Sequence, residues 1–183
     1  MNALGALACV SALGADQDQA LHSLKLWSPV KGRGAREEIQ LGSGKILMLD
    51  DSYNANPTSM AAALDVLAAT PGAGRRIAYL GDMKELGPEE DALHIALARR
   101  PAVQSIDQIH CIGPLMHHLH VALPDAKRGS WYQTSAEVLP DLSAQIQAGD
   151  IVLAKGSLSI ALAKIVDGIR NLGHAGPKSD ITK

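Results

Sequence analysis

The sequence of 183 residues contains no phenylalanine, and aromatic residues make up only 3% of it. Its formal net charge at pH 7 is −2. Proteins that bind single-stranded nucleic acids stack the bases on aromatic side chains within a basic groove. Because the sequence supplies neither feature, we expect no nucleic-acid partner, and we expect a core built mainly from aliphatic side chains.

Cysteine is scarce too, and Cys9 and Cys111 form no C-x-x-C pair. This pattern excludes a disulfide framework and a zinc knuckle, and we expect no metal site within the chain. No apolar segment reaches the roughly 18 residues of a membrane helix, and the N-terminus lacks the basic region of a signal peptide. We therefore expect a cytoplasmic protein without membrane insertion.

The two common glycine-rich nucleotide motifs are missing as well. A P-loop needs G-x-x-x-x-G-K-[ST] between a strand and a helix, whereas Gly42-Ser43-Gly44-Lys45 is followed by a strand-like run. No G-x-G-x-x-G opens a helix after a strand either. We interpret residues 42–44 as the turn of a β-hairpin between residues 37–41 and 45–50.

Beyond the hairpin, apolar runs typical of strands alternate with segments typical of helices. The further strands are expected at residues 75–81, 108–113, 131–133 and 150–155. The helices between and after them are expected at residues 88–100, 114–123, 135–147 and 160–172. This βαβα order predicts an α/β, Rossmann-like fold, a mostly parallel sheet with helices on both faces.

A short helical segment precedes this domain. Residues 2–13 are predicted to form one helix, and Asp16 is predicted to cap a second. Lys31 to Arg36 has the glycine and charge content of a flexible linker. We therefore divide the chain into a helical segment (1–30), a linker (31–36), an α/β domain (37–172) and a flexible tail (173–183).

The segment from Asp50 to Met60 is the clearest candidate for a ligand-binding turn. A strand-like run ends at Asp50 and Asp51, and neighbouring side chains of an extended chain point to opposite sides. Only one carboxylate, that of Asp51, is therefore expected to face a crevice. Asn56 is typical of an N-cap and Pro57 of the first helical position. Such turns lie where open α/β sheets bind ligands.

Two further strand ends carry polar residues. Gly81-Asp82-Met83-Lys84-Glu85-Leu86-Gly87 follows one predicted strand, and Lys155-Gly156-Ser157 follows another. The ammonium and hydroxyl of the second turn suit recognition of an anion. Because the carboxyl ends of parallel strands share one edge of a sheet, we expect these turns to join residues 50–60 in one site.

These three turns, in this order, resemble the C-terminal domain of the Mur ligases. The matching residues are Asp50-Asp51-Ser52-Tyr53-Asn54-Ala55-Asn56-Pro57, then Gly81-Asp82-Met83-x-Glu85-Leu86-Gly87, then Gly149-Asp150-x-Val152-Leu153-x-Lys155-Gly156-Ser157. The similarity is to the branch that adds D-Ala-D-Ala, and residues 1–30 resemble the end of the central ATPase domain of such enzymes.

The resemblance implies an ATP-dependent ligase of peptidoglycan synthesis. Such enzymes convert a substrate carboxylate to an acyl phosphate, which an amine then attacks to form an amide. The implied cofactors are ATP and Mg²⁺, and the implied partners are UDP-MurNAc-tripeptide and D-Ala-D-Ala, acted on by a monomer in the cytoplasm. The family's P-loop and Mg²⁺ ligands have no counterpart in this sequence, so we expect no catalytic residue within it and negligible activity from it alone.

The resemblance also implies roles for individual residues. The implied nucleotide-binding residues are Asn2 near the adenine, Arg33 at the phosphates, Asp51 at the ribose, and Tyr53, Asn54 and Asn56 on the same closing surface. The implied substrate-binding residues are Lys155 and Ser157 near the incoming dipeptide, together with Asp82, whose individual role is not assigned. We expect Asp51→Ala to impair the full-length enzyme while leaving its folding largely intact.

Two alternatives stay open at this point. One is another ligase of the same superfamily, such as an enzyme that adds glutamate to a folate. The other is a binding module that kept the fold and lost catalysis. The resemblance to Mur ligases also leads us to expect an arginine soon after Ser157, but the residues there are Leu158-Ser159-Ile160.

Overall fold

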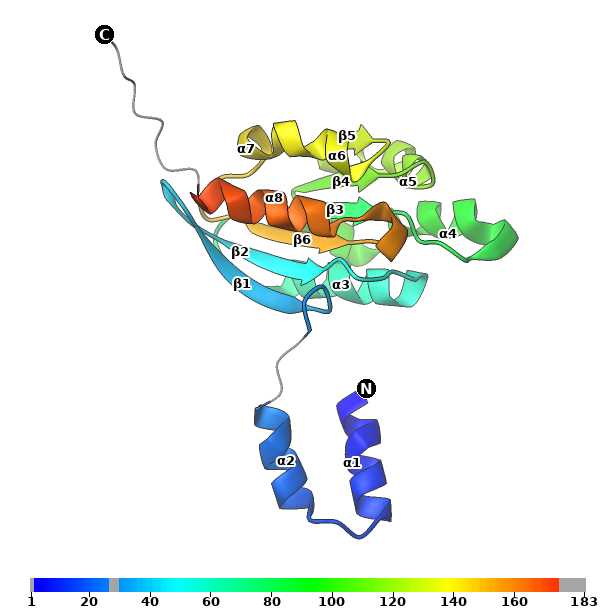
Figure 1. Cartoon of the computed structure of the whole chain (residues 1–183). Coiled ribbons are helices and arrows are strands. Elements are labelled where there is room, and N and C mark those ends of the chain that lie inside the picture. Colours follow the sequence, from blue (N-terminus) through cyan, green and yellow to red (C-terminus); the bar gives the residue numbers. More distant parts are fainter. Residues whose placement is uncertain (1, 27–29, 175–183) are drawn as a thin grey trace.

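The computed structural model describes residues 2–26 and 30–174, and within these ranges a six-stranded sheet carries helices on both faces (Figure 1). The strands are β1 (Ala35–Leu41), β2 (Gly44–Asp51), β3 (Arg76–Gly81), β4 (Gln108–Ile112), β5 (Arg128–Tyr132) and β6 (Ile151–Lys155). The α-helices are α1 (Asn2–Ala12), α2 (Gln17–Lys25), α3 (Pro57–Ala69), α4 (Glu90–Leu97), α5 (Met116–Ala122), α6 (Ser135–Val138), α7 (Leu142–Gln145) and α8 (Ala163–His174).

The strand order in the sheet is β1-β2-β6-β3-β4-β5. β1 and β2 form an antiparallel hairpin in which Leu41 pairs with Gly44, and the pairs from β2 to β5 are all parallel. The predicted α/β fold with a mostly parallel sheet and a leading hairpin is confirmed. β6 comes last in the chain but lies between β2 and β3, which places the three polar strand ends side by side.

Two apolar layers cover the two faces of the sheet. On one face, Met60, Leu64 and Leu67 of α3 are buried, since their spacing places them on one side of the helix, and α4 and α5 extend this layer. On the other face, α6, α7 and α8 cover the sheet, and Ile165 and Ile169 of α8 are buried there (Figure 1). The chain therefore leaves β2 toward one face and β6 toward the other.

The start of α3 follows directly from local sequence. The side chain of Asn56 accepts a hydrogen bond from the backbone N–H of Ser59 at 2.8 Å, and the Ser59 hydroxyl accepts one from the N–H of Asn56 at 3.1 Å. Pro57 occupies the first turn, where its missing N–H needs no partner. The predicted cap is confirmed, and it fixes the angle at which the chain leaves the end of β2.

The predicted helix over residues 135–147 is wrong as a single element. The structure has α6, a 3₁₀ turn over Leu139–Asp141, and α7 in its place. Pro140 would lie inside a continuous helix, where its ring clashes with the carbonyl of Ala136 and its nitrogen offers no donor. The apolar residues keep a helical spacing on both sides of Pro140, and for this reason the spacing indicated a single helix.

Other boundaries differ as well. The segment predicted as a helix over residues 88–100 begins with a 3₁₀ turn over Gly87–Glu89, and α4 ends at Leu97. β5 begins at Arg128 rather than residue 131, because an edge strand needs little apolar character. Before α8, a 3₁₀ turn is followed by Ala161 in the left-handed conformation, so the helix begins at Ala163 rather than residue 160.

The N-terminal segment contains two helices, as predicted. α1 and α2 contact each other, and the carboxylate of Asp16 caps α2 by accepting the N–H groups of Asp18 and Gln19 at 2.9 and 3.0 Å. The tail expected over residues 173–183 lies outside the described residues from residue 175 onward. α8 continues through residue 174, past the expected boundary at 172. Among the helices described, none is long and apolar enough to span a lipid bilayer.

The segment from Lys31 to Arg36, expected as a flexible linker, is attached to the end of β2. The carbonyl of Gly32 accepts the N–H of Tyr53, and the N–H of Gly34 donates to the carbonyl of Asp50, both at 2.9 Å. Residues 35 and 36 already belong to β1. The backbone hydrogen bonds give this short segment a defined place beside the polar turn.

Inside the sheet, His110 of β4 is buried, and no acidic side chain in the described part of the chain pairs with it. Its ring stacks on Tyr79 with centroids 4.9 Å apart, and its Nδ1 accepts the N–H of Ser130 at 3.1 Å. Its Nε2 makes no hydrogen bond within the described residues. Burial lowers the pKa of His110 to about 4. The imidazole is therefore neutral in the folded protein near pH 7.

This histidine should make the chain sensitive to acid. Because the pKa is lower in the folded state than the unfolded value of 6.5, the unfolded chain binds the proton more tightly. Above about pH 6.5, His110 is neutral in both states and does not reduce the free energy of unfolding. As the pH falls from 6.5 toward 4, the unfolded chain binds a proton that the folded chain does not, and the free energy of unfolding decreases. We expect this group to account for roughly 3 kcal/mol of the free energy of unfolding across that range.

Urea unfolding of wild type and His110→Gln at pH 7 and pH 4.5 measures this effect. The difference between the two pH values should be smaller in the variant, because glutamine does not titrate. His22→Gln, a change of an exposed histidine on α2, serves as the matched control and should keep the wild-type difference. An equal pH dependence in wild type and His110→Gln would contradict the assignment.

Candidate functional site

The candidate site lies at the carboxyl ends of β2, β6 and β3. These neighbouring parallel strands end in the turns that begin at Asp51, Lys155 and Asp82. The chain departs from β2 and from β6 toward opposite faces, which creates the crevice where open α/β sheets bind ligands. The expectation that the three polar turns meet at one edge is confirmed.

Asp51 and Lys155 form an ion pair at the centre of this edge. They are direct neighbours in the β2–β6 register, and Lys155 Nζ donates to Asp51 Oδ2 at 2.6 Å. The ammonium also donates to the backbone carbonyl of Asn54 at 2.9 Å. The Lys155 side chain is only 2% exposed, whereas that of Asp51 is 29% exposed. The lysine therefore supports the turn from beneath, and the carboxylate faces outward.

This ion pair revises one expectation about Asp51. Removal of the carboxylate would leave a buried ammonium with only a carbonyl for a partner, which is strongly unfavourable. Asp51→Ala should therefore affect folding as well as binding. Asp50 points the other way, as alternation predicts. It is 1% exposed, and its Oδ1 accepts the hydroxyl of Ser52 at 2.6 Å.

A polar cavity of about 270 Å³ opens above this pair, and we call it the Asp51 cavity. Its walls are formed by Gly32, Arg33, Asp51, Tyr53, Asn54, Ala55, Asn56, Ser59 and Lys155. The guanidinium of Arg33 lies 4.0 Å from the centroid of the Tyr53 ring, in a cation–π interaction. The cavity thus presents one guanidinium and one carboxylate to the same space.

Five of the predicted nucleotide-binding residues are brought together in this cavity, but the side-chain oxygens of its two asparagines are used within the turn. The side-chain oxygen of Asn56 is used by the cap of α3, and that of Asn54 accepts the N–H of Ala55 at 2.8 Å. Asp51 Oδ1 and the Arg33 guanidinium have no hydrogen bond within the described residues. The side chain of Asn2 lies outside the description.

A second cavity, of about 450 Å³, lies beside the first, and we call it the Ser157 cavity. It is lined by Tyr53, Asn54, Lys84, Glu85, Ser157, Leu158 and Ser159. All three turns contribute to it, and Tyr53 and Asn54 form a wall shared with the Asp51 cavity. Two ligands could therefore occupy neighbouring cavities separated by one turn of the chain.

Close backbone contact between the turns shapes the Ser157 cavity. A Cβ at Gly156 would lie 2.8 Å from the Cα of Gly81, so only glycine allows β6 and β3 to end this close together. The N–H of Ser157 donates to the carbonyl of Asp82 at 3.0 Å, and its hydroxyl accepts the N–H of Lys84 at 2.9 Å. The predicted substrate residue Ser157 thus lines the cavity and also joins two turns.

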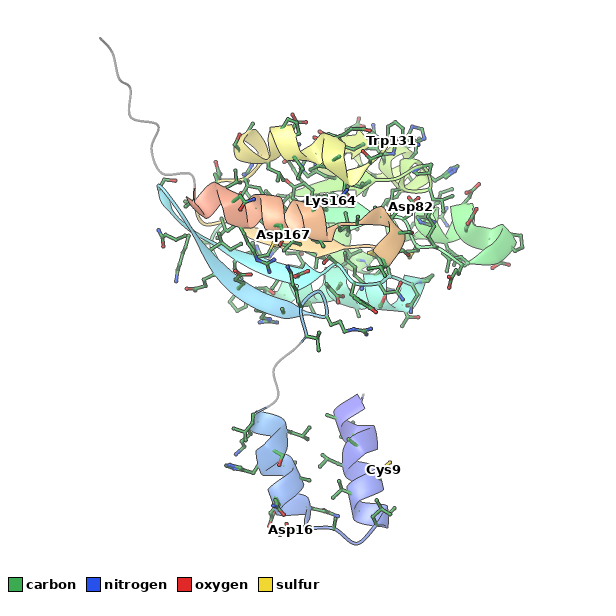
Figure 2. All side chains as sticks on the ribbon, in the orientation of Figure 1. Cys9, Asp16, Asp82, Trp131, Lys164 and Asp167 are labelled. Carbon is green, nitrogen blue, oxygen red and sulfur yellow. The ribbon has the colours of Figure 1, made fainter. Side chains whose placement is uncertain are left out.

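Asp82 follows β3 (Figure 2). Its carboxylate is fully buried, and both carboxylate oxygens have partners within the chain. Oδ1 accepts the N–H of Met116 at the start of α5, and Oδ2 accepts Lys84 Nζ, each at 2.8 Å. The side chain does not line either cavity. Its geometry therefore favours a role in holding Lys84 over direct contact with a ligand.

Sequence reasoning did not single out the side chain of Lys84. The glycine-bounded motif that contains it identified the turn, but nothing in the motif distinguished its members.

No group of three or more histidine, cysteine or acidic side chains in the described residues could hold a metal ion.

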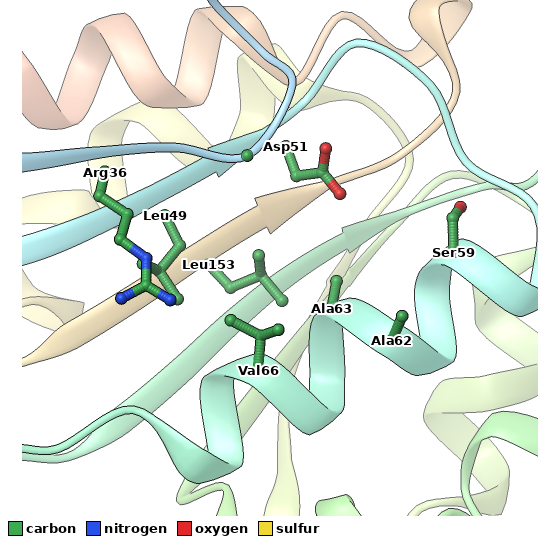
Figure 3. A pocket seen from close by; sticks show the side chains of 9 residues that line it. Arg36, Leu49, Asp51, Ser59, Ala62, Ala63, Val66 and Leu153 are labelled. Atoms are coloured by element: carbon green, nitrogen blue, oxygen red, sulfur yellow. The ribbon is translucent and has the colours of Figure 1, made fainter. Parts of the chain in front are cut away.

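An apolar groove of about 360 Å³ runs along the α3 side of β2 (Figure 3). Leu49, Leu153 and Val66 line it, Arg36 stands at one end, and Asp51 stands at the other. It meets the Asp51 cavity at Asp51 and Ser59. The carboxylate of Asp51 is thus accessible from two sides.

Comparison with known proteins agrees with this architecture. A family model of the Mur ligase, glutamate ligase domain, matches residues 35–158. The chain belongs to this family. The matched span includes the whole sheet and the three turns of the site, so this edge is part of the Mur ligase domain itself.

Relatives of this Mur ligase domain include two named UDP-N-acetylmuramoyl-tripeptide–D-alanyl-D-alanine ligase. The protein from Escherichia coli K12 is 34% identical over 174 residues, which are 94% of this chain and 37% of the relative. The protein from Bacillus subtilis 168 is 31% identical over 169 residues, which are 91% of this chain and 36% of the relative. The chain therefore spans little more than a third of the length of these relatives.

Solved structures of MurF proteins share the fold of this Mur ligase domain. A crystal structure of MurF from Acinetobacter baumannii has a TM-score of 0.76 at 30% identity, covering 93% of this chain and 37% of that one. MurF from Thermotoga maritima, solved in complex with ADP, has a TM-score of 0.75, covering 92% of this chain and 36% of that one. Its identity is 22%, so it shows the fold alone.

Proposed function

We propose that this chain is the C-terminal domain of an ATP-dependent ligase that adds D-Ala-D-Ala to UDP-MurNAc-tripeptide in cytoplasmic peptidoglycan synthesis. The observation that carries the proposal is the pair of neighbouring cavities on either side of Tyr53 and Asn54. A ligase that joins an activated acid to an amine needs a nucleotide and an acceptor close together, and the two cavities provide adjacent places for them. The names of the relatives support the choice of substrates.

In this proposal, the Asp51 cavity binds the ribose and phosphate part of ATP. The Asp51 carboxylate would accept hydrogen bonds from ribose hydroxyls, and Arg33 would donate to phosphate oxygens. A volume of about 270 Å³ lies just below the usual range of ligand cavities, about 300–1,000 Å³, so it fits part of a nucleotide. ATP supplies the phosphoryl group that activates the acid. The residues of this chain orient the nucleotide and exclude water from one side of it.

The same proposal gives roles to the remaining site residues. Tyr53, Asn54 and Asn56 would form the surface that closes over the nucleotide, and the resemblance to Mur ligases assigns Asn2 to the adenine. Lys155 acts through Asp51 and the carbonyl of Asn54 rather than by direct contact with a substrate. The hydroxyl of Ser157 faces the incoming dipeptide, and Asp82 supports the same cavity from beneath.

Activity of the full-length protein tests this proposal. With ATP, UDP-MurNAc-tripeptide and D-Ala-D-Ala, we expect ADP and UDP-MurNAc-pentapeptide, measured by mass spectrometry. The 183-residue chain alone should give no product, because it contains no phosphate loop. Ligation of glutamate to a folate, without formation of the pentapeptide, would instead favour the alternative ligase. Turnover by the 183-residue chain alone would contradict the proposal that catalysis requires the rest of the full-length protein.

A further inference from the structure

The turn after β3 is fixed at three successive residues. The N–H of Asp82 donates to the carbonyl of Ile112 at 3.1 Å, and the N–H of Met83 donates to Nε2 of buried His94 at 3.0 Å. The N–H of Lys84 donates to the Ser157 hydroxyl. These bonds place the backbone of Lys84 at the rim of the Ser157 cavity.

The side chain of Lys84 is held as well. Its Nζ lies 2.8 Å from Asp82 Oδ2, and that carboxylate is itself fixed by the N–H of Met116. Asp82 is fully buried, whereas the Lys84 side chain is 38% exposed and lines the Ser157 cavity. An ammonium has three donors, and Asp82 uses one of them. Lys84 therefore keeps donors for a ligand in the cavity.

Lys155 cannot fill this role. Its ammonium is buried, is shared between Asp51 and the carbonyl of Asn54, and lines the other cavity. Among the described residues that line the Ser157 cavity, Lys84 supplies the one cation. An acceptor whose carboxylate enters this cavity would therefore meet Lys84 rather than Lys155.

The other lining groups indicate the class of ligand. The hydroxyls of Ser157 and Ser159 can donate to a carboxylate, and Glu85 places a negative charge on the same wall. Glu85 has φ of 64°, a left-handed conformation that turns the chain directly after Lys84. One cation and one anion side by side suit a zwitterion better than a phosphate, and a free dipeptide is a zwitterion at pH 7.

We propose that Lys84, positioned by Asp82, binds the terminal carboxylate of the incoming dipeptide in the Ser157 cavity. This inference rests on the proposed ligase function and names a specificity residue for it. Asp82 is a positioning residue, because its carboxylate contacts Lys84 and Met116 and does not line the cavity. The turn after β3, residues 81–87, would thereby help to select the acceptor substrate.

Steady-state kinetics of the full-length enzyme with D-Ala-D-Ala and with its C-terminal amide test the proposal. Wild type should strongly prefer the free acid. In Lys84→Met, the KM for D-Ala-D-Ala should rise roughly 10- to 100-fold, the loss of one charge-assisted hydrogen bond. The KM values for ATP and UDP-MurNAc-tripeptide should stay unchanged. The preference of the variant for acid over amide should fall close to 1, and Lys84→Arg should restore part of it.

Lys164→Met is the matched control, because Lys164 is exposed on α8 (Figure 2) and lines neither cavity. It should keep the wild-type preference for the acid. An unchanged acid-to-amide preference in Lys84→Met would overturn the role of Lys84 while leaving the ligase function intact. Failure of wild type to ligate D-Ala-D-Ala would instead overturn the proposed function. Circular dichroism of each variant confirms that the fold is retained.

Discussion

Asp51→Ala is expected to lower the free energy of unfolding by about 3 kcal/mol, because it leaves the buried Lys155 ammonium without its counter-ion. The partial exposure of Asp51 keeps the expected value at the low end for a buried ion pair. Urea unfolding of the 183-residue chain at pH 7 measures the loss. The same change should abolish the proposed contact to the ribose in the full-length enzyme and raise its KM for ATP.

The double variant Asp51→Ala with Lys155→Met separates folding from function. It removes both charges, so its stability should return to within about 1 kcal/mol of wild type. Its KM for ATP should remain high, because the carboxylate is still missing. Asp51→Asn keeps an oxygen for Lys155 and should fold better than Asp51→Ala. A stable Asp51→Ala chain would show that the ion pair contributes little to folding, and a normal KM for ATP in the double variant would exclude Asp51 from the nucleotide site.

Gly156→Ala is expected to reduce kcat/KM of the full-length enzyme roughly 100-fold by displacing the turns that form the Ser157 cavity. The new methyl group would lie 2.8 Å from both Gly81 Cα and Leu162 Cδ1. The backbones of β3 and β6 would have to separate, which should also lower the free energy of unfolding by about 1–3 kcal/mol. Enzyme kinetics and urea unfolding measure the two effects.

Gly42→Ala provides the control for Gly156→Ala. Gly42 lies in the hairpin turn and is exposed, and no heavy atom lies within 4 Å of the place that a new methyl group would take there. The same chemical change should therefore leave kinetics unaltered and stability within about 0.5 kcal/mol. Equal behaviour of the two variants would mean that close approach of the two turns is not required for the site.

Local signals predicted the elements that depend on local chemistry. Asn56 and Pro57 fixed the start of α3, and apolar alternation with helices predicted the mostly parallel sheet. The failures occur where a neighbour in space decides the outcome. β5 extends through polar Arg128 because β4 pairs with it, and Pro140 interrupts a segment whose apolar spacing is otherwise helical.

The same distinction, between features that local sequence determines and features that neighbours in space determine, applies to the candidate site. The sequence predicted that polar turns would meet at one edge, since topology alone requires it. It did not predict that Lys155 would be buried under Asp51, because the two residues are 104 positions apart and are neighbours only in the sheet. Nor did it separate Asp82 from Lys84, since burial of one and exposure of the other depend on α5 and β6.

The hydrogen bonds that attach Gly32 and Gly34 to the end of β2 set a mechanical condition on any longer ligase that contains this domain. If the domain swings, the pivot must lie on the N-terminal side of Gly32. Arg33 and Asp51 then move together with the domain. The proposed contacts to phosphate and to ribose would therefore form and break in the same movement.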